Sequence, residues 1–214
     1  MAQAAARVGR NAHSVTLLAV TKAQPPEVVR AAADCGLGDF GESYLQEALG
    51  KLDALQDLTL TWHFVGRIQA NKTRAIAERF AWVHAVDRLK IATRLSEQRP
   101  YHAPPLNVCL QVRLADEAAK GGAAAGELAG LARAVAQLPR LRLRGLMCIP
   151  PEETQPELQH AWFRELRRLL EALNAGGAQL DTLSMGMSGD FEAAIEEGST
   201  IVRVGTALFG PRPP

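Results

Sequence analysis

The amino-acid sequence predicts a (β/α)8 barrel, and three features point to this fold class. Short runs of apolar and β-branched residues recur along the chain, and most precede a stretch whose apolar residues repeat about every 3.6 positions, as in an amphipathic helix. The run cores VTLLAV, NVCLQV and IVRVG are almost continuously apolar, which is typical of parallel strands covered by helices. Eight such runs in 214 residues favour a minimal closed barrel over the alternative, an open doubly wound sheet.

The expected strands and helices follow from this alternation. The strands are expected at residues 15–22, 37–43, 61–67, 81–87, 106–114, 141–149, 182–188 and 201–209. The helices are expected at residues 26–35, 44–55, 71–80, 88–98, 124–138, 156–175 and 191–197. Pro26 suits a first helical turn, Asn71 can cap the helix after it, and Gly176 can end the longest helix. Because the chain has no fixed-period repeat and no linker-like tract, residues 1–214 are expected to form one domain.

Composition argues against several classes of function. The 24 Lys and Arg residues balance 23 Asp and Glu, and a net charge of +1 gives no bulk attraction for nucleic acid or for an anionic membrane. The apolar runs are too short to span a bilayer and residues 1–10 lack a secretory apolar stretch, so the cytoplasm is the expected compartment. Cys35, Cys109 and Cys148 lie far apart without metal-ligand spacing, which predicts reduced thiols and no metal site.

Polar residues that end or interrupt the apolar runs are the first candidates for a site, because active sites of such barrels lie at the carboxyl ends of the strands. Lys22 ends the first run. There it is expected to point into the barrel mouth, where partial loss of water contact would free its amine to attack an aldehyde. A solvated lysine at a strand end explains the same position equally well.

The ends of the last two runs carry small residues and hydroxyls. Ser184 and Ser188 lie in the segment LSMGMS, and Gly205 and Thr206 lie in RVGT. Phosphate sites of these barrels are frequently built by the loops after strands seven and eight, where free backbone N–H groups and hydroxyls approach the anion. Each segment is a weak signal by itself, but the pair at these two strands favours a phosphate site.

Arg203 interrupts an apolar strand, which is costly unless the charge is paired or serves a ligand. A permanent cation facing the ring nitrogen of a pyridine cofactor would keep that nitrogen unprotonated and weaken the ring as an electron sink. A buried ion pair with a carboxylate is the alternative.

His63 and His84 lie in the third and fourth runs, where a histidine is more often a hydrogen-bonded core residue than an acid or base.

Several long segments match a known family. They are AVTK at 19–22, DFGESYLQE at 39–47, WHFVGRIQANK at 62–72, HAVDRLKIA at 84–92, RGLMCIP at 144–150, LSMGMSGDFEAAI at 183–195 and GSTIVRVGTALFG at 198–210. On these segments the chain resembles the pyridoxal phosphate homeostasis proteins of the YggS/PROSC type. The resemblance covers nearly the whole chain and implies a barrel of the alanine racemase N-terminal-domain type.

The resemblance implies that Lys22 forms the Schiff base with pyridoxal 5′-phosphate and that Arg203 faces the pyridine nitrogen. The full set of expected cofactor-binding residues is Lys22, Ser43, His63, Ser184, Met185, Ser188, Arg203, Gly205 and Thr206. Lys120 matches a loop lysine near the cofactor. Two departures stand out: Ser43 replaces a usual asparagine, and Gln24 replaces a common second lysine.

The family's role implies a protein that carries or buffers pyridoxal phosphate and maintains vitamin B6 and amino-acid balance. It is expected to deliver the cofactor to pyridoxal-phosphate-dependent apoenzymes without turnover of its own. The even charge and the absence of a racemase-like β domain favour a monomer. The alternative is a weak amino-acid racemase with Lys22 as base. Racemases take their second base from a tyrosine in an additional domain, and this chain ends at Pro214 with only Tyr44 and Tyr101. A purely structural barrel is a third possibility, and an unpaired Arg203 argues against it.

Overall fold

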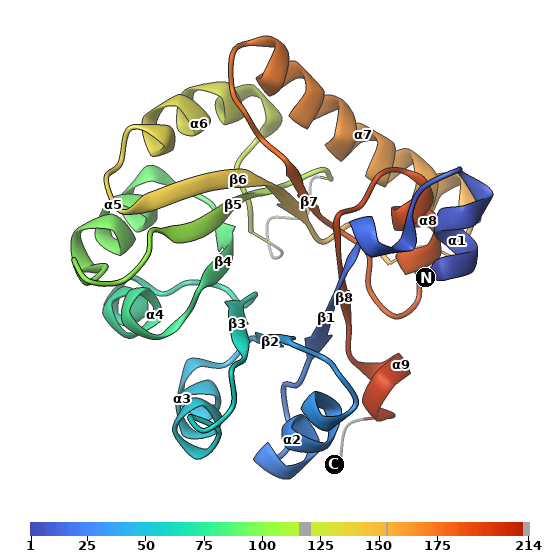
Figure 1. Cartoon of the computed structure of the whole chain (residues 1–214). Helices are drawn as coiled ribbons and strands as arrows, with labels where there is room; N and C mark the ends of the chain where they lie inside the picture. Colours follow the sequence, from blue (N-terminus) through green and yellow to red (C-terminus); the bar gives the residue numbers. More distant parts are fainter. Residues whose placement is uncertain (116–120, 153, 212–214) are drawn as a thin grey trace.

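Eight parallel strands close into a barrel in chain order, with the first strand paired to the last. The computed structural model describes residues 1–115, 121–152 and 154–211. Figure 1 shows the strands at the centre and the helices around them. The strands are β1 (Thr16–Val20), β2 (Asp39–Glu42), β3 (Thr61–Phe64), β4 (Trp82–Val86), β5 (Leu106–Val112), β6 (Leu141–Cys148), β7 (Thr182–Ser184) and β8 (Ile201–Val204). The predicted (β/α)8 barrel is confirmed, and the open sheet is excluded.

Helices surround the barrel, one before the first strand and the others after the strands. They are α1 (Ala2–Arg7), α2 (Pro26–Asp34), α3 (Leu45–Ala54), α4 (Thr73–Arg79), α5 (Leu89–Gln98), α6 (Leu128–Ala136), α7 (Pro156–Ala175), α8 (Phe191–Glu196) and α9 (Thr206–Phe209). Short 3-10 turns lie at η1 (Ala12–Ser14), η2 (Ala70–Lys72) and η4 (Ala125–Glu127). No helix in the described part of the chain is both long and apolar enough to cross a membrane.

The predicted helix ends are confirmed at two places and wrong at a third. Pro26 lies in the first turn of α2, and Gly176 ends α7. The predicted cap at Asn71 is wrong, because Asn71 lies inside η2 and Lys72 directly precedes α4. The 3-10 turn η2 runs directly into α4, so the backbone is already helical there and the helix begins without a side-chain cap.

The last two strands are shorter than predicted. They end at Ser184 and Val204, and residues 206–209, expected to extend the last strand, form the helix α9 instead. The chain leaves the barrel at Gly186, whose φ of +95° is a backbone conformation that favours glycine. The backbone therefore turns away from the barrel soon after both strands end.

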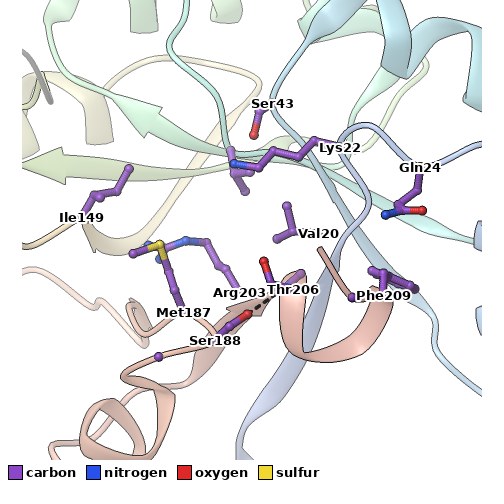
Figure 2. Close-up of a pocket in the computed structure, with 14 residues that line it drawn as sticks. Val20, Lys22, Gln24, Ser43, Ile149, Met187, Ser188, Arg203, Thr206 and Phe209 are labelled. Carbon is purple, nitrogen blue, oxygen red and sulfur yellow. Dashed lines mark hydrogen bonds between the residues drawn. The ribbon is translucent and has the colours of Figure 1, made fainter. Parts of the chain in front are cut away.

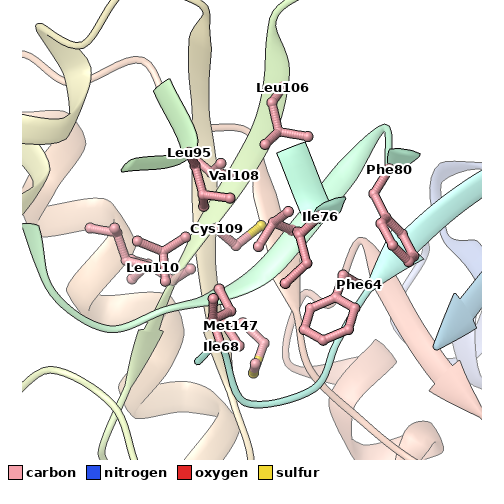
Figure 3. Close-up of a cluster of buried hydrophobic side chains, with 14 of the residues drawn as sticks. Phe64, Ile68, Ile76, Phe80, Leu95, Leu106, Val108, Cys109, Leu110 and Met147 are labelled. Carbon is pink, nitrogen blue, oxygen red and sulfur yellow. The ribbon is translucent and has the colours of Figure 1, made fainter. Parts of the chain in front are cut away.

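The main hydrophobic core lies between the strands and the surrounding helices (Figure 3). Phe64 on β3 meets Phe80 edge to face, with ring centroids 5.4 Å apart. Burial of each large apolar side chain contributes about 1.5–3 kcal/mol, so this layer dominates the stability of the barrel. Cys109 and Cys148 belong to it, and burial raises the pKa of both thiols to about 12, which keeps them protonated and unreactive.

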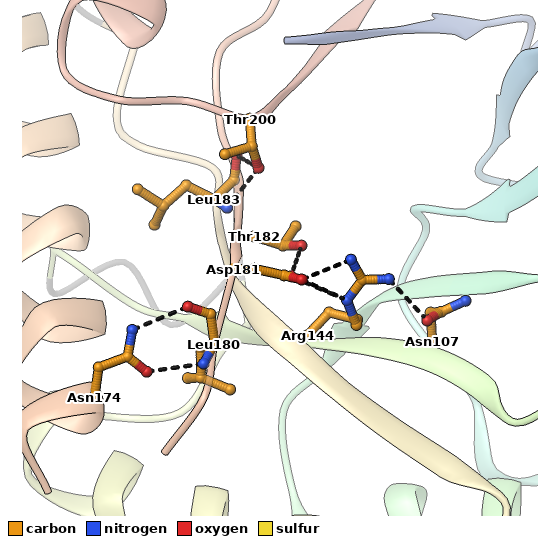
Figure 4. Close-up of polar contacts among 8 residues, drawn as sticks. All are labelled: Asn107, Arg144, Asn174, Leu180, Asp181, Thr182, Leu183 and Thr200. Atoms are coloured by element: carbon orange, nitrogen blue, oxygen red, sulfur yellow. Dashed lines mark hydrogen bonds and ion pairs between the residues drawn. The ribbon is translucent and has the colours of Figure 1, made fainter. Parts of the chain in front are cut away.

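Side-chain bonds reinforce the short strand β7 at the amino-terminal end of the barrel (Figure 4). Arg144 on β6 donates to both carboxylate oxygens of Asp181, at 2.8 to 3.2 Å, and to the Asn107 side chain. The Asn174 amide bonds both the N–H and the C=O of Leu180. These contacts hold the start of β7 at the end that faces away from the barrel mouth, where such barrels carry stability rather than chemistry.

Candidate functional site

A cavity of about 250 Å³ opens at the carboxyl ends of β1 and β8. Figure 2 shows Lys22 reaching over it from the loop after β1, with Arg203 and Thr206 on the β8 side. Six of the nine residues predicted for the site line this cavity: Lys22, Ser43, Ser188, Arg203, Gly205 and Thr206. The structure thus brings together residues from the two ends of the sequence.

Three predicted residues are buried and do not line the cavity. His63, Ser184 and Met185 are buried, and the cavity wall is formed by Met187 in place of Met185. Side chains of extended backbone alternate between the two faces of a sheet, so Met185, directly after the inward-facing Ser184 of β7, packs in the hydrophobic core. The methionine that sequence reasoning missed comes after the turn at Gly186.

Gln24 and Ser43, the two positions at which the resemblance leads us to expect other residues, both line the same cavity. Lys120, which the resemblance places near the cofactor, lies outside the described residues.

The Ser188 hydroxyl gathers backbone donors at the β8 side of the cavity. It accepts from the N–H of Ala207 at 3.2 Å and from that of Gly205 at 3.4 Å. The Thr206 residue between them lines the cavity as well. An anion bound here would replace the Ser188 hydroxyl as the acceptor of the two N–H groups, and that hydroxyl would then donate to the anion, as in backbone nests that bind phosphate.

Arg203 is buried at the base of the cavity and is held by oxygen acceptors rather than by an acid. Its guanidinium donates to the Ser184 carbonyl at 2.6 Å, to the Ser184 hydroxyl at 3.0 Å and to the Cys148 carbonyl at 2.8 Å. Among the described residues no carboxylate lies in direct ion-pair contact with it, and the Asp190 carboxylate interacts with it only electrostatically. Burial lowers the pKa of Arg203 from its ordinary high value, but an arginine stays charged.

A chain of hydrogen bonds runs from Arg203 through the interior of the barrel. The Ser184 hydroxyl lies 2.7 Å from Nδ1 of His84 on β4. Nε2 of His84 lies 2.9 Å from Nδ1 of His63 on β3, and Nε2 of His63 lies 3.0 Å from a carboxylate oxygen of Asp39 at the start of β2. Five inward-facing residues from five strands thus form one connected path.

The two ends of this path assign its direction. Arg203 can only donate and the Asp39 carboxylate can only accept, so the Ser184 hydroxyl donates to His84, His84 to His63, and His63 to Asp39. Both histidines are then neutral. Burial lowers the pKa of His63 and lowers that of His84 well below its ordinary value, which agrees with this assignment. The expectation of hydrogen-bonded core histidines fits this arrangement.

Comparison with known proteins identifies the family. The family model for the alanine racemase N-terminal domain matches residues 1–213. A protein of Pseudomonas aeruginosa is 62% identical over 210 residues, which cover 98% of this chain and 90% of that protein. One of Escherichia coli K12 is 50% identical over 212 residues, covering 98% and 91%. Both bear the name pyridoxal phosphate homeostasis protein. This chain belongs to that family.

Solved structures agree with the family assignment. PipY of Synechococcus elongatus, solved with pyridoxal phosphate bound, is 37% identical with a TM-score of 0.87, and the match covers 98% of this chain and 99% of that one. The same protein without the cofactor gives a TM-score of 0.88. Alanine racemase of Clostridium difficile 630 is 14% identical with a TM-score of 0.75, covering 94% of this chain and 53% of the racemase, and shows a shared fold alone. The resemblance found in the sequence is confirmed.

Proposed function

We propose that this protein binds pyridoxal 5′-phosphate reversibly through a Schiff base on Lys22 and buffers or delivers it in the homeostasis of vitamin B6 and amino acids. One observation carries the proposal: Lys22, a buried cation and a cluster of amide and hydroxyl donors share one cavity. The family's name and the cofactor-bound PipY structure support the same ligand.

The residues of the cavity fit the three polar parts of the cofactor. When bound, pyridoxal phosphate supplies an aldehyde that condenses with amines and a pyridine ring that accepts electrons. The Lys22 amine suits the aldehyde, and the donors around Ser188 suit the phosphate. Arg203 suits the ring nitrogen, and Val20, Ile149 and Met187 provide apolar walls for the ring. His63 and Ser184 support the site from beneath through the hydrogen bonds that lead to Arg203, while Met185 packs in the core.

Arg203 favours a carrier over an enzyme. Its guanidinium donates hydrogen bonds to the backbone carbonyls of Ser184 and Cys148, which fix its position. A permanent cation beside a ring nitrogen opposes protonation of that nitrogen. Carbanion chemistry on the ring is weakened as a result. The racemase alternative also needs a second base, and no tyrosine is among the described residues that line the cavity. Tyr44 and Tyr101 are both exposed elsewhere.

The proposal extends to partners and place of action. A buffer of pyridoxal phosphate acts where apoenzymes that use this cofactor are made, so we assign such apoenzymes as recipients and the cytoplasm as the compartment. The described residues that line the cavity all come from one barrel, which supports a single-domain monomer.

The absorption spectrum of the purified protein with added pyridoxal phosphate tests the anchor. A Schiff-base band that borohydride fixes on the Lys22 peptide is expected for wild type and for Lys90→Ala, a matched change of an exposed lysine on α5. Lys22→Ala should lose the band. A band that Lys22→Ala retains would overturn the assignment of the site.

Hydrogen exchange at the α-carbon separates carrier from enzyme. Amino acids incubated in deuterated buffer with the loaded protein should exchange no faster than with free pyridoxal phosphate. Exchange that is faster, and that disappears in Lys22→Ala, would instead support the racemase alternative.

A further inference from the structure

We infer that the buried ammonium of Lys51, together with the carboxylates of Glu42 and Glu47, positions Lys22 by fixing the backbone on both sides of it. This inference rests on the proposed function, because it concerns how Lys22 is presented to its ligand. It assigns a role to three residues that do not line the cavity at the barrel mouth.

Lys51 lies in the last turn of α3, and its side chain is only 3% exposed. Its ammonium donates to the carbonyl of Thr21, to Oε1 of Glu42 at 2.7 Å and to Oε1 of Glu47. All three protons of the ammonium therefore have an acceptor. The cation is the centre of a cluster that joins α3 to the ends of β1 and β2.

The cluster holds the residue before Lys22 and the residue after it. The Thr21 hydroxyl donates to Oε1 of Glu42 at 2.6 Å, and the backbone N–H of Ala23 donates to Oε1 of Glu47 at 2.7 Å. Each flanking residue is thus bound to a carboxylate that Lys51 itself holds. Lys22 is the one residue of this tripeptide that lines the cavity.

The turn that the cluster fixes is an unfavourable one. Ala23 has a φ of +63°, in the left-handed region that residues with a side chain rarely adopt. Such a conformation persists only where its surroundings hold it. Here Glu47 binds the Ala23 N–H, and the Gln24 N–H donates to the Thr21 carbonyl at 3.0 Å.

Strand alternation explains why holding these neighbours orients Lys22. A Cβ on Gly41 would touch the side chains of Leu18 and Val20, so Gly41 faces the barrel interior and its neighbour Glu42 faces outward. Val20 and Lys22 both line the cavity, while Thr21 between them bonds Glu42 on the outer side. A network that fastens Thr21 outward therefore directs Lys22 inward.

Stability alone is a poor reason for this arrangement. Two carboxylates share one buried ammonium, and Oε2 of Glu42 is buried without a hydrogen-bond partner among the described residues. Removing charged groups from water costs more than such a cluster returns unless every atom is satisfied, so buried ion clusters often serve to specify one conformation. The conformation specified here is the turn that carries Lys22.

The experiment measures how fast pyridoxal phosphate forms the Schiff base at Lys22 in the full apo-chain, by stopped-flow absorbance. The test variant combines Lys51→Met with Glu42→Gln, which removes both charges of the buried pair together. The matched control combines Arg79→Met with Asp53→Asn, an exposed ion pair that also involves α3. Inhibition of the reaction by inorganic phosphate is measured in parallel, because it reports the donors around Ser188 and not the lysine.

A positioning role predicts a divergence between the two readouts. The test variant should react about tenfold more slowly or worse, since small misplacement of a reacting group costs large factors in rate. Its inhibition constant for phosphate should stay within about twofold of wild type, and the control should match wild type in both. A wild-type rate in the folded test variant would overturn the inference, and so would a parallel loss of phosphate binding, which indicates general loosening.

A second variant keeps the test decisive if the double variant does not fold. Glu47→Gln removes the charge of a carboxylate that is 30% exposed, so folding is expected to survive. It should still slow the reaction of Lys22 and leave phosphate inhibition unchanged, whereas an unchanged rate would overturn the inference. Failure of the proposed function looks different: wild type itself would then form no Schiff base at Lys22.

Discussion

Arg203 at the base of the cavity and Asp39 at the opposite end of the barrel are joined by an unbroken chain of hydrogen bonds through Ser184, His84 and His63. Every donor in the chain points from the arginine toward the carboxylate. The acceptor strength of the Ser184 hydroxyl next to Arg203 therefore depends on two neutral histidines deeper in the barrel.

Protonation of these histidines is expected to destabilise the protein in mild acid. Burial lowers the pKa of His63, and it lowers that of His84 further, so the unfolded chain takes up protons at a higher pH than the folded chain does. Stability is then complete above the unfolded-state pKa of about 6.5 and is lost as the pH falls below it. Urea unfolding between about pH 7.5 and 5.5 should show a loss of up to about 1.4 kcal/mol per pH unit for each histidine.

Variants isolate this effect from other titrating groups. His13→Gln changes an exposed histidine and should keep the wild-type pH dependence, whereas His84→Gln should reduce it. Burial raises the pKa of Glu42 even though Lys51 and Thr21 bind it. Its contribution to the free energy of unfolding therefore has the opposite pH dependence and is lost as the pH rises above about 4.5. The same pH dependence in wild type and His84→Gln would contradict the prediction.

Ser188→Ala is expected to weaken binding of the phosphate rather than of the ring. The hydroxyl collects the N–H groups of Gly205 and Ala207, and hydrogen bonds to charged groups contribute about 1.5–3 kcal/mol. The affinity for pyridoxal phosphate should therefore fall about tenfold, while that for pyridoxal, which lacks the phosphate, stays within about twofold. Absorbance titrations with both ligands measure this, with Ser14→Ala as the control. An equal loss for both ligands would show that Ser188 acts on the whole cavity.

The sequence predicts the barrel and the outline of the site because both depend on local patterns. Lys22 follows an apolar run, and Ser188, Gly205 and Thr206 follow the seventh and eighth runs, so their place at the mouth follows from the strand order. The fold prediction succeeded for the same reason. The ends of the strands were harder to predict. Residues 206–209 are as apolar as a strand, but in the structure they form the helix α9.

Other parts of the site depend on contacts that no local pattern contains. The path from Asp39 to Arg203 needs the register of five strands, so single histidines in strands looked like ordinary core residues. Lys51 looked like one more lysine of an amphipathic helix. Its burial arises because α3 packs its ammonium over the carbonyl of Thr21, a contact between residues 30 positions apart.

Gly186→Ala is expected to lower the free energy of unfolding by about 1–3 kcal/mol, because it places a side chain on a left-handed residue. The backbone φ there is +95°, and the added Cβ would lie 2.5 Å from the Cβ of Ala194 on α8. Gly189 in the same loop gives the matched control, since a Cβ there meets no atom within 4 Å. Gly189→Ala should therefore unfold in urea like wild type. Equal stability of the two variants would mean that the turn after β7 adapts freely, and the loop would then be too soft to hold Ser188 beneath the amides of α9.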